Sequence, residues 1–193
     1  IADPNAAQDH TVPTASVFGQ KGGALGIGND TKVIAYDAAG GGCAAARVWW
    51  MFRAYGHDNV AVLDGGLTKW RSENKPLSAD QPQIGAKSFA ATQEALEMVR
   101  SKDDIKNNID AALYQVVDAR SAGRFAGTDP EPKAGLRSGH IPSSLNVPFG
   151  SLFVSDTKTI RSADDLQAQF DGAGVDLNAP MATTCGSGVT ACT

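Results

Sequence analysis

Two distant segments of the sequence can be superposed without a gap. Residues 26–37 and residues 174–185 both run from a turn into a short apolar or β-branched stretch, and both lead into a glycine-rich loop. The offset of 148 residues is the size of one domain. The sequence of 193 residues therefore predicts a tandem duplication. Because Cys185 ends the second segment where Asp37 ends the first, we expect one working site and one scaffolding domain.

The stretch around Cys185 predicts a strand, a tight loop and the start of a helix. Residues 181–184 are apolar or β-branched, and Gly186 and Gly188 follow the cysteine. The glycines allow positive φ angles, which fold backbone N–H groups around the sulfur. Amide donors at a helix N-terminus stabilise a thiolate and lower the pKa of the thiol. The pattern favours a reactive thiolate, and the alternative is a buried cysteine before an ordinary turn.

The rest of the chain alternates predicted strands with predicted helices. β-branched runs, helix-spaced aromatic residues and glycines at element ends support these assignments. Such alternation is typical of an α/β fold, here with a mostly parallel sheet flanked by helices in each of two tandem domains. The predicted helices are 15–25, 44–55, 67–73, 92–107 (with Thr92 as its N-cap) and 163–170. The predicted strands are 32–36, which we expect to be buried, 60–63, 114–117, 145–147 and 181–184.

One irregular stretch separates the two predicted domains. Residues 74–88 contain two prolines, several charges and few large apolar side chains, as linkers do. We therefore place the first domain at residues 1–75, the linker at 76–90 and the second domain at 91–193.

A second irregular stretch lies inside the second domain. Residues 121–139 carry Arg124, Lys133 and Arg137, together with the rigid Asp-Pro-Glu-Pro sequence of residues 129–132. A proline-stiffened basic loop of this length within a compact domain is usually functional. A solvated surface loop is the alternative.

The composition excludes several classes of protein. Lys and Arg total 17 against 21 for Asp and Glu, which gives a net charge of −4 and argues against a nucleic-acid or acidic-membrane partner. The three cysteines, Cys43, Cys185 and Cys192, do not form an even disulfide framework. No apolar run approaches the roughly 20 residues that span a bilayer.

Further motifs follow one another along nearly the whole chain. They are Arg47-Val-Trp-Trp-Met-Phe52, Leu63-Asp-Gly-Gly-Leu67 with Trp70, Asp118-Ala-Arg120, Gly123-Arg-Phe125, Pro130-Glu-Pro132, Gly139-His-Ile-Pro142 with Asn146 and Pro148, and Cys185-Gly-Ser-Gly-Val-Thr190. In this order and spacing they resemble the rhodanese superfamily, in its 3-mercaptopyruvate sulfurtransferase version.

The resemblance implies sulfur transfer through a persulfide on Cys185. A small-molecule donor, 3-mercaptopyruvate, would be converted to pyruvate, and a thiol, such as that of thioredoxin, or cyanide would accept the sulfur. The loop residues Gly186, Gly188, Val189 and Thr190 would line the substrate site. The amide-lined loop would hold the thiolate and the persulfide without a cofactor or a metal.

The resemblance also implies two cationic side chains for the substrate carboxylate, Arg124 and Lys133. The family commonly has arginine at the second position, so Lys133 departs from the pattern. Lysine keeps the charge but loses the bidentate fork, which predicts weaker carboxylate binding or looser specificity. Arg120 and Glu131 match a structural ion pair of the family.

A serine, a histidine and an aspartate form the family's proton-handling group. Ser187 and His10 match the first two, and the aspartate would lie upstream of Ile1. His10 would polarise Ser187 toward the substrate carbonyl across the domain interface. Without the resemblance, His10 reads as a solvated loop histidine.

Three competing functions follow from the same residues. A thiosulfate sulfurtransferase usually has basic residues after the cysteine, where this chain has the neutral Gly186 and Ser187. A phosphatase of the related fold needs an arginine six positions after the cysteine, where this chain has Ala191. A non-catalytic binding module would not need the intact loop of Cys185.

Members of the family extend beyond this sequence at both ends, so we expect the first domain to lack its start and the second to lack its end. The cytoplasm is the predicted compartment, although a missing N-terminus leaves a targeting segment open. Neither Cys43 nor Cys192 matches a family nucleophile, and we expect Cys192 to be packed rather than redox-active.

Overall fold

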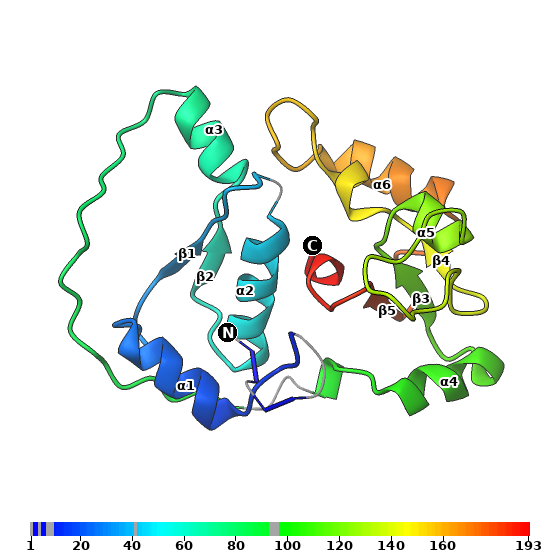
Figure 1. The fold of residues 1–193 in the computed structure, drawn as a ribbon, viewed down its shortest axis with the longest axis horizontal. Coiled ribbons are helices and arrows are strands. Elements are labelled where there is room, and N and C mark those ends of the chain that lie inside the picture. The colour runs from blue at the N-terminus through cyan, green and yellow to red at the C-terminus, as the bar shows by residue number, and fades with distance from the viewer. Residues whose placement is uncertain (1, 4, 7–9, 41, 93–96) are drawn as a thin grey trace.

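The computed structural model describes residues 2–3, 5–6, 10–40, 42–92 and 97–193, and these form two lobes. The first lobe holds β1 (Val33–Ala35), β2 (Val60–Val62), α1 (Ala15–Ala24), α2 (Cys43–Ala54) and α3 (Gly66–Ser72). Its two strands are parallel, with Val33 opposite Val60 (Figure 1). The predicted α/β class and parallel sheet are confirmed for this lobe.

The second lobe is built on three parallel strands in the order β4-β3-β5. They are β3 (Gln115–Asp118), β4 (Leu145–Asn146) and β5 (Met181–Thr184). The helical elements are α4 (Lys102–Ala111), α5 (Ala122–Ala126), η2 (Phe149–Leu152), α6 (Ala163–Gly172) and η3 (Thr190–Cys192). Because β3 and β5 are parallel neighbours, the residues that follow them lie at the same carboxyl edge of the sheet. Asp118 at the end of β3 and the Cys185 loop after β5 are therefore close together.

Aromatic residues fill the core of the first lobe. Phe18 of α1 stacks on Tyr55, directly after α2, with 4.3 Å between ring centroids, and Phe52 meets Phe18 edge-on. Phe52 and Tyr55 are buried, and the helix-spaced Val48 and Trp49 are partly buried against them. Phe89, from the end of the segment predicted as a linker, completes this cluster and is 7% exposed. The chain after α3 first runs along the outside of the lobe and then returns to its core (Figure 1).

A smaller core lies beneath the sheet of the second lobe. It consists of Val117, Val147, Leu152 and Val175, with Leu166 and Phe170 of α6 packed against it. The Ser162 hydroxyl caps α6 by accepting a hydrogen bond from the Asp165 backbone N–H at 3.2 Å. This core holds β3 and β4 in place, and with them the residues that follow each strand.

The helix predicted over 92–107 is confirmed only from residue 102 on, and residues 97–101 are not α-helical. Residues 93–96 lie outside the described residues, and α4 begins only after Ser101. Ser101 and Asp104 form a reciprocal capping box, in which the Asp104 backbone N–H donates to the Ser101 hydroxyl at 3.1 Å. The residues that Thr92 is predicted to cap lie outside the described residues, and the backbone N–H and hydroxyl of Thr92 both donate to the Tyr55 carbonyl, at 3.0 and 3.3 Å.

Two further predictions need correction. The segment 32–36 is not a fully buried strand, because Ile34 and Tyr36 are about half exposed while Ala35 is buried. Alternate side chains of a strand point to opposite faces, and α2 contacts β1 on one of them. The predicted loop 121–139 contains the short helix α5, which places Arg124 on a helix.

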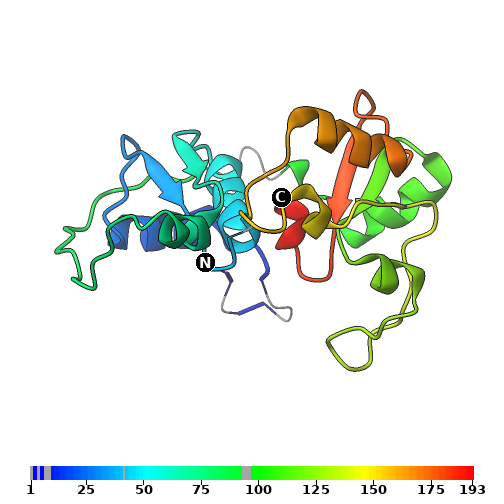
Figure 2. The ribbon, with the colours of Figure 1, turned by 90° about the horizontal axis from the view of Figure 1, so that it is seen from above.

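The two lobes also meet directly. The C-terminal helical turn η3 packs against α2. It lies between the two lobes when the molecule is seen from above (Figure 2). A second contact joins the Ile160 backbone N–H to the Asp64 carboxylate at 2.8 Å. The Cys185 loop therefore faces a helix of the other lobe.

Truncation of Phe89 tests its place in the first core. Phe89→Ala should lower the unfolding free energy of the first lobe by about 3 kcal/mol, because removal of a buried aromatic ring leaves a cavity. Leu77→Ala is the matched control in the same segment, since Leu77 is 60% exposed, and it should change stability by less than about 0.5 kcal/mol. Urea unfolding followed by aromatic fluorescence measures both, and equal effects would contradict the packing.

Candidate active site

Backbone amides of the loop after β5 surround the sulfur of Cys185. The Gly188 N–H lies 3.1 Å from Cys185 Sγ and donates to it. Gly188 has a φ of +69°, a conformation that favours glycine and turns this N–H back toward the cysteine. The loop leads into η3, which stands where the sequence predicted the start of a helix.

These donors outweigh the effect of burial on the thiol. Burial raises the pKa of Cys185, but the Thr190 hydroxyl and the backbone N–H groups of Ser187, Ala191 and Gly188 donate to the sulfur, and the net pKa is lowered. Hydrogen bonds to a charged form favour that form. The site therefore holds a thiolate more readily than an ordinary cysteine does.

Asp37 occupies the corresponding position in the first lobe. Its Oδ1 accepts from the Ala39 and Gly40 N–H groups at 3.0 and 2.9 Å. Its Oδ2 accepts from the Ala44 and Ala45 N–H groups in the first turn of α2 at 3.1 and 3.3 Å. Both copies thus collect backbone N–H groups on one anion after a parallel strand. In the first lobe, the Asp37 carboxylate accepts hydrogen bonds from all four of these N–H groups.

Two arginines and two carboxylates form a network beside the Cys185 loop. Arg120 binds the nearly inaccessible Asp118 through Nη2 at 2.6 Å and binds Glu131 through Nη1 at 2.8 Å. Arg124 binds the other oxygen of Glu131 through Nη2 at 2.6 Å. The expected pair of Arg120 and Glu131 is therefore present, and Arg124 joins it. The hydrogen bond from Arg124 and the charges of both arginines outweigh burial and lower the pKa of the Glu131 carboxyl.

Arg124 lies directly against the loop. A Cβ atom built on Gly186 would come within 2.7 Å of Arg124 Nη2, so a larger residue at 186 would displace the guanidinium. The Nε and Nη2 atoms of Arg124 face Glu131, and within the described residues Nη1 donates no hydrogen bond. The N–H groups of this nitrogen can donate to the carboxylate of a ligand next to Cys185.

Arg47 connects the N-terminal segment with the Cys185 loop. Its Nη2 donates to the His10 carbonyl at 3.0 Å, and its Nη1 donates to the Gly188 carbonyl at 3.1 Å. The guanidinium also lies over the Trp50 ring, 4.8 Å from the centroid. No sequence motif assigned Arg47 to the site. The presence of a cation within the mostly apolar sequence of α2 was the feature that could have indicated it.

The other predicted site residues differ in how close they lie to Cys185 and in how exposed they are. Ser187 is exposed, and its backbone N–H rather than its hydroxyl contacts Cys185. Among the described contacts, no hydrogen bond joins the His10 ring to Ser187. Val189 is half-buried and precedes η3, and Lys133 lies exposed in the segment after Glu131.

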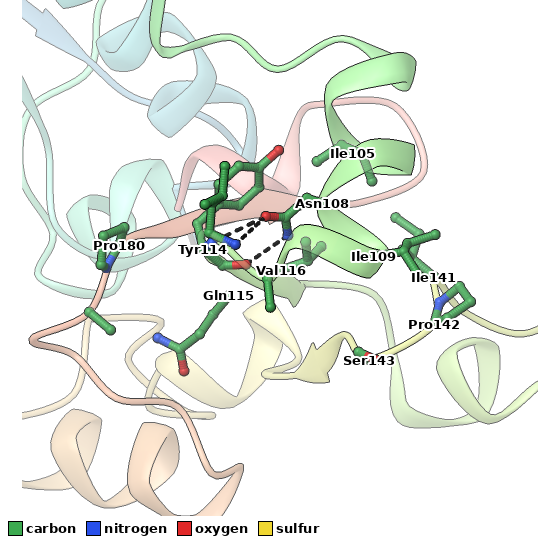
Figure 3. Close-up of a pocket in the computed structure, with 13 residues that line it drawn as sticks. Ile105, Asn108, Ile109, Tyr114, Gln115, Val116, Ile141, Pro142, Ser143 and Pro180 are labelled. Carbon is green, nitrogen blue, oxygen red and sulfur yellow. Dashed lines mark hydrogen bonds between the residues drawn. The ribbon is translucent and has the colours of Figure 1, made fainter.

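A separate pocket of about 270 Å³ lies elsewhere in the second lobe. Apolar side chains of α4, including Ile105 and Ile109, line it together with Val116 and Pro180 (Figure 3). Asn108 closes one side, where its Nδ2 donates to the Tyr114 carbonyl at 2.8 Å. No residue of the Cys185 site lines this pocket.

In the described ranges, no three His, Cys, Asp or Glu side chains are placed to bind a metal ion. Nor does any helix there have the length and apolar character needed to cross a bilayer.

Comparison with known proteins places this arrangement in a class. The model of the rhodanese-like domain matches residues 4–73 and 101–193. The crystal structure of SseA from Escherichia coli, from a report on the rhodanese fold and on 3-mercaptopyruvate sulfotransferases, superposes with a TM-score of 0.86 at 33% identity, covering 99% of this chain and 70% of SseA. The chain belongs to the rhodanese family, with two rhodanese-like domains.

Two curated relatives are named after different sulfur donors. The chain is 43% identical over 192 residues to the 3-mercaptopyruvate sulfurtransferase of Rattus norvegicus, and 40% identical over 192 residues to the thiosulfate sulfurtransferase of the same species. The matches cover 99% and 98% of this chain. The chain spans 64% of the length of each relative.

Removal of the Thr190 hydroxyl tests the stabilised thiolate. Thr190→Val should raise the pKa of Cys185, because one donor to the charged sulfur is lost. In a Cys43→Ser, Cys192→Ser background, the alkylation rate of Cys185 near pH 7 should fall roughly tenfold, which is the effect of one charged hydrogen bond. Thr157→Val, in an exposed turn, is the control. An unchanged pH profile for Thr190→Val would contradict the assigned hydrogen bond.

Proposed function

We propose that the protein is a sulfurtransferase that moves sulfur from 3-mercaptopyruvate to a thiol or cyanide acceptor. The main support for this proposal is the environment of the Cys185 thiol, which accepts hydrogen bonds from backbone N–H groups in a loop that lies directly beside Arg124. A thiolate stabilised in this way can attack sulfur and remain as a persulfide. The 43% identity to a 3-mercaptopyruvate sulfurtransferase supports this donor.

The chemical step is a displacement at sulfur. The Cys185 thiolate attacks the donor sulfur, an S–S bond forms, and the C–S bond of the donor breaks. The electron pair of the C–S bond passes to the enolate of pyruvate, which takes up a proton and leaves. The sulfur stays on Cys185 as a persulfide, and the N–H group of Gly188 can donate to it as it does to the thiol.

The remaining residues would bind the donor and manage its proton. Arg124 offers Nη1 to the carboxylate, and Lys133 adds a positive charge from the same segment. Ser187 would face the carbonyl that becomes the enolate. His10 would assist Ser187, and Arg47 would hold the His10 backbone close to the loop.

The acceptor, the domain limits and the compartment belong to this proposal as well. A small protein thiol such as that of thioredoxin, or cyanide, would take the sulfur from Cys185. Residues 1–75 would serve as the scaffolding domain, residues 76–90 as the linker and residues 91–193 as the catalytic domain. The cytoplasm remains the predicted compartment.

Thiosulfate is the second candidate donor. The 40% identity to a thiosulfate sulfurtransferase favours it, and the arginine beside the loop suits an anionic donor. The neutral Gly186 and Ser187 weigh against it, because a dianion binds better where further cations are fixed.

The mass of the intact protein distinguishes the two donors. Incubation with 3-mercaptopyruvate should add at least one sulfur atom per chain and release one pyruvate for each sulfur atom added, and thiosulfate should react much more slowly. Cys185→Ser should add no sulfur with either donor, whereas Cys192→Ser should react as the wild type does. Uptake of sulfur by Cys185→Ser at the wild-type rate would contradict the assignment of Cys185 as the nucleophile.

Substitution of Arg124 tests the carboxylate site. Arg124→Ala should lower kcat/KM for 3-mercaptopyruvate by about one to two orders of magnitude, the effect of one charged hydrogen bond. Arg137→Ala, which removes an exposed arginine of the same segment, should leave kcat/KM nearly unchanged. Melting temperatures control for folding, since Arg124 also pairs with Glu131. Equal kinetics for both variants would show that Arg124 does not bind the donor.

A further inference from the structure

A second thiol, that of Cys43, lies on the helix of the first lobe that packs against the turn after Cys185. Cys43 is the first residue of α2, and Arg47 follows it by one helical turn on the same face. Arg47 Nη1 contacts the Gly188 carbonyl at 3.1 Å and lies 3.8 Å from Cys192 Sγ. The face of α2 that carries Cys43 is thus the face that packs on the Cys185 loop and on η3.

The electrostatics of Cys43 agree with this placement. Burial is the main cause that raises the pKa of the Cys43 thiol, the Asp37 carboxylate is the next, and the charges of Cys185 and Cys192 add to it. Three half-buried thiols from two lobes therefore lie close enough to affect one another. The proposed function uses only one of them.

We propose that Cys43 is a second sulfur-carrying residue, which takes the outer sulfur of the Cys185 persulfide and presents it to the acceptor. This inference rests on the proposed function, because it requires that Cys185 first acquires a sulfur. The persulfide sulfur extends the Cys185 side chain by one S–S bond of about 2 Å. This extension would carry the transferable atom beyond the loop amides, on the side where α2 packs against η3 and Arg47 contacts Gly188.

The transfer step needs no oxidant. The Cys43 thiol loses its proton to solvent, and its sulfur attacks the outer sulfur of the persulfide. A new S–S bond forms on Cys43 while the S–S bond on Cys185 breaks, and the electron pair of that bond remains on the Cys185 sulfur. One persulfide and one thiol become one thiol and one persulfide, so no group is oxidised or reduced overall.

The direction of transfer follows from the two environments. In thiol exchange a leaving thiol with a low pKa departs faster, and an attacking thiolate with a higher pKa is intrinsically more nucleophilic. Four donors stabilise the Cys185 thiolate as it leaves. Cys43 has the opposite character, because burial and Asp37 raise the pKa of its thiol. The stabilised leaving thiolate of Cys185 favours movement of the sulfur to Cys43, whereas the small thiolate fraction of Cys43 near pH 7 slows the attack.

The surroundings of Cys43 also favour release. The N–H groups of Ala44 and Ala45, which follow Cys43 in the first turn of α2, are already bound to Asp37. A persulfide on Cys43 would therefore not have the amide contacts that hold it on Cys185. Its sulfur is easier for an external thiol to remove, and Cys185 is meanwhile free for a second donor molecule.

The test follows sulfur in the protein without any acceptor. Excess 3-mercaptopyruvate is added, pyruvate and intact mass are measured over time, and alkylated peptides then locate the added sulfur. The wild type should gain two sulfur atoms per chain, first on Cys185 and later also on Cys43. Cys43→Ser should gain one sulfur atom and release one pyruvate instead of two. Cys185→Ser should carry no sulfur on Cys43, and Cys192→Ser is the matched thiol control that should behave as the wild type.

Several results would overturn the relay. Sulfur found only on Cys185 in the wild type, despite one pyruvate per chain, would show that Cys43 accepts nothing. A second sulfur on Cys192, or a disulfide between Cys43 and Cys185 with loss of sulfide, would also contradict it. Sulfur on Cys43 in Cys185→Ser would mean direct transfer from the donor. Absence of both pyruvate and added mass would instead refute the proposed function itself, so the two failures can be told apart.

Discussion

Backbone N–H groups that converge on one anion at the end of a parallel strand organise both lobes. In the second lobe the anion is the Cys185 thiolate, and in the first it is the Asp37 carboxylate. The arrangement needs a strand that delivers the residue, a loop that turns the amides inward, and a helical element that supplies further N–H groups. The same backbone can therefore serve a structural role with aspartate and a chemical one with cysteine.

The chemistry depends on charges that are fixed around this loop. Glu131 holds Arg120 and Arg124 together, and Asp118 anchors Arg120 from the buried end of β3. Arg124 is thereby held beside Gly186, where only a residue without a side chain leaves room for the guanidinium. The network carries as many negative as positive charges. A carboxylate bound there would therefore depend on the position and orientation of the Arg124 guanidinium rather than on a large excess of positive charge.

Arg47 gives the first lobe a direct part in the site. It joins the His10 backbone to the Gly188 carbonyl, and it brings the start of α2, with Cys43, toward the loop. A scaffolding domain with no nucleophile in its own loop can thus contribute a positioning residue and a further thiol. The contact between Asp64 and Ile160 supports the same placement of the lobes from a second point.

The sequence by itself determined the α/β class, most of the elements and the family, because strand runs, glycine turns and ordered motifs are local properties of a chain. It also singled out the loop of Cys185, since the spacing of Gly186 and Gly188 fixes where backbone N–H groups can point. It misplaced the start of α4, where the capping box at Ser101 prevailed. Only the tertiary structure placed Arg47 of α2 against the Cys185 loop, because a contact between two lobes depends on how α2 packs across the interface, and no local pattern encodes that packing.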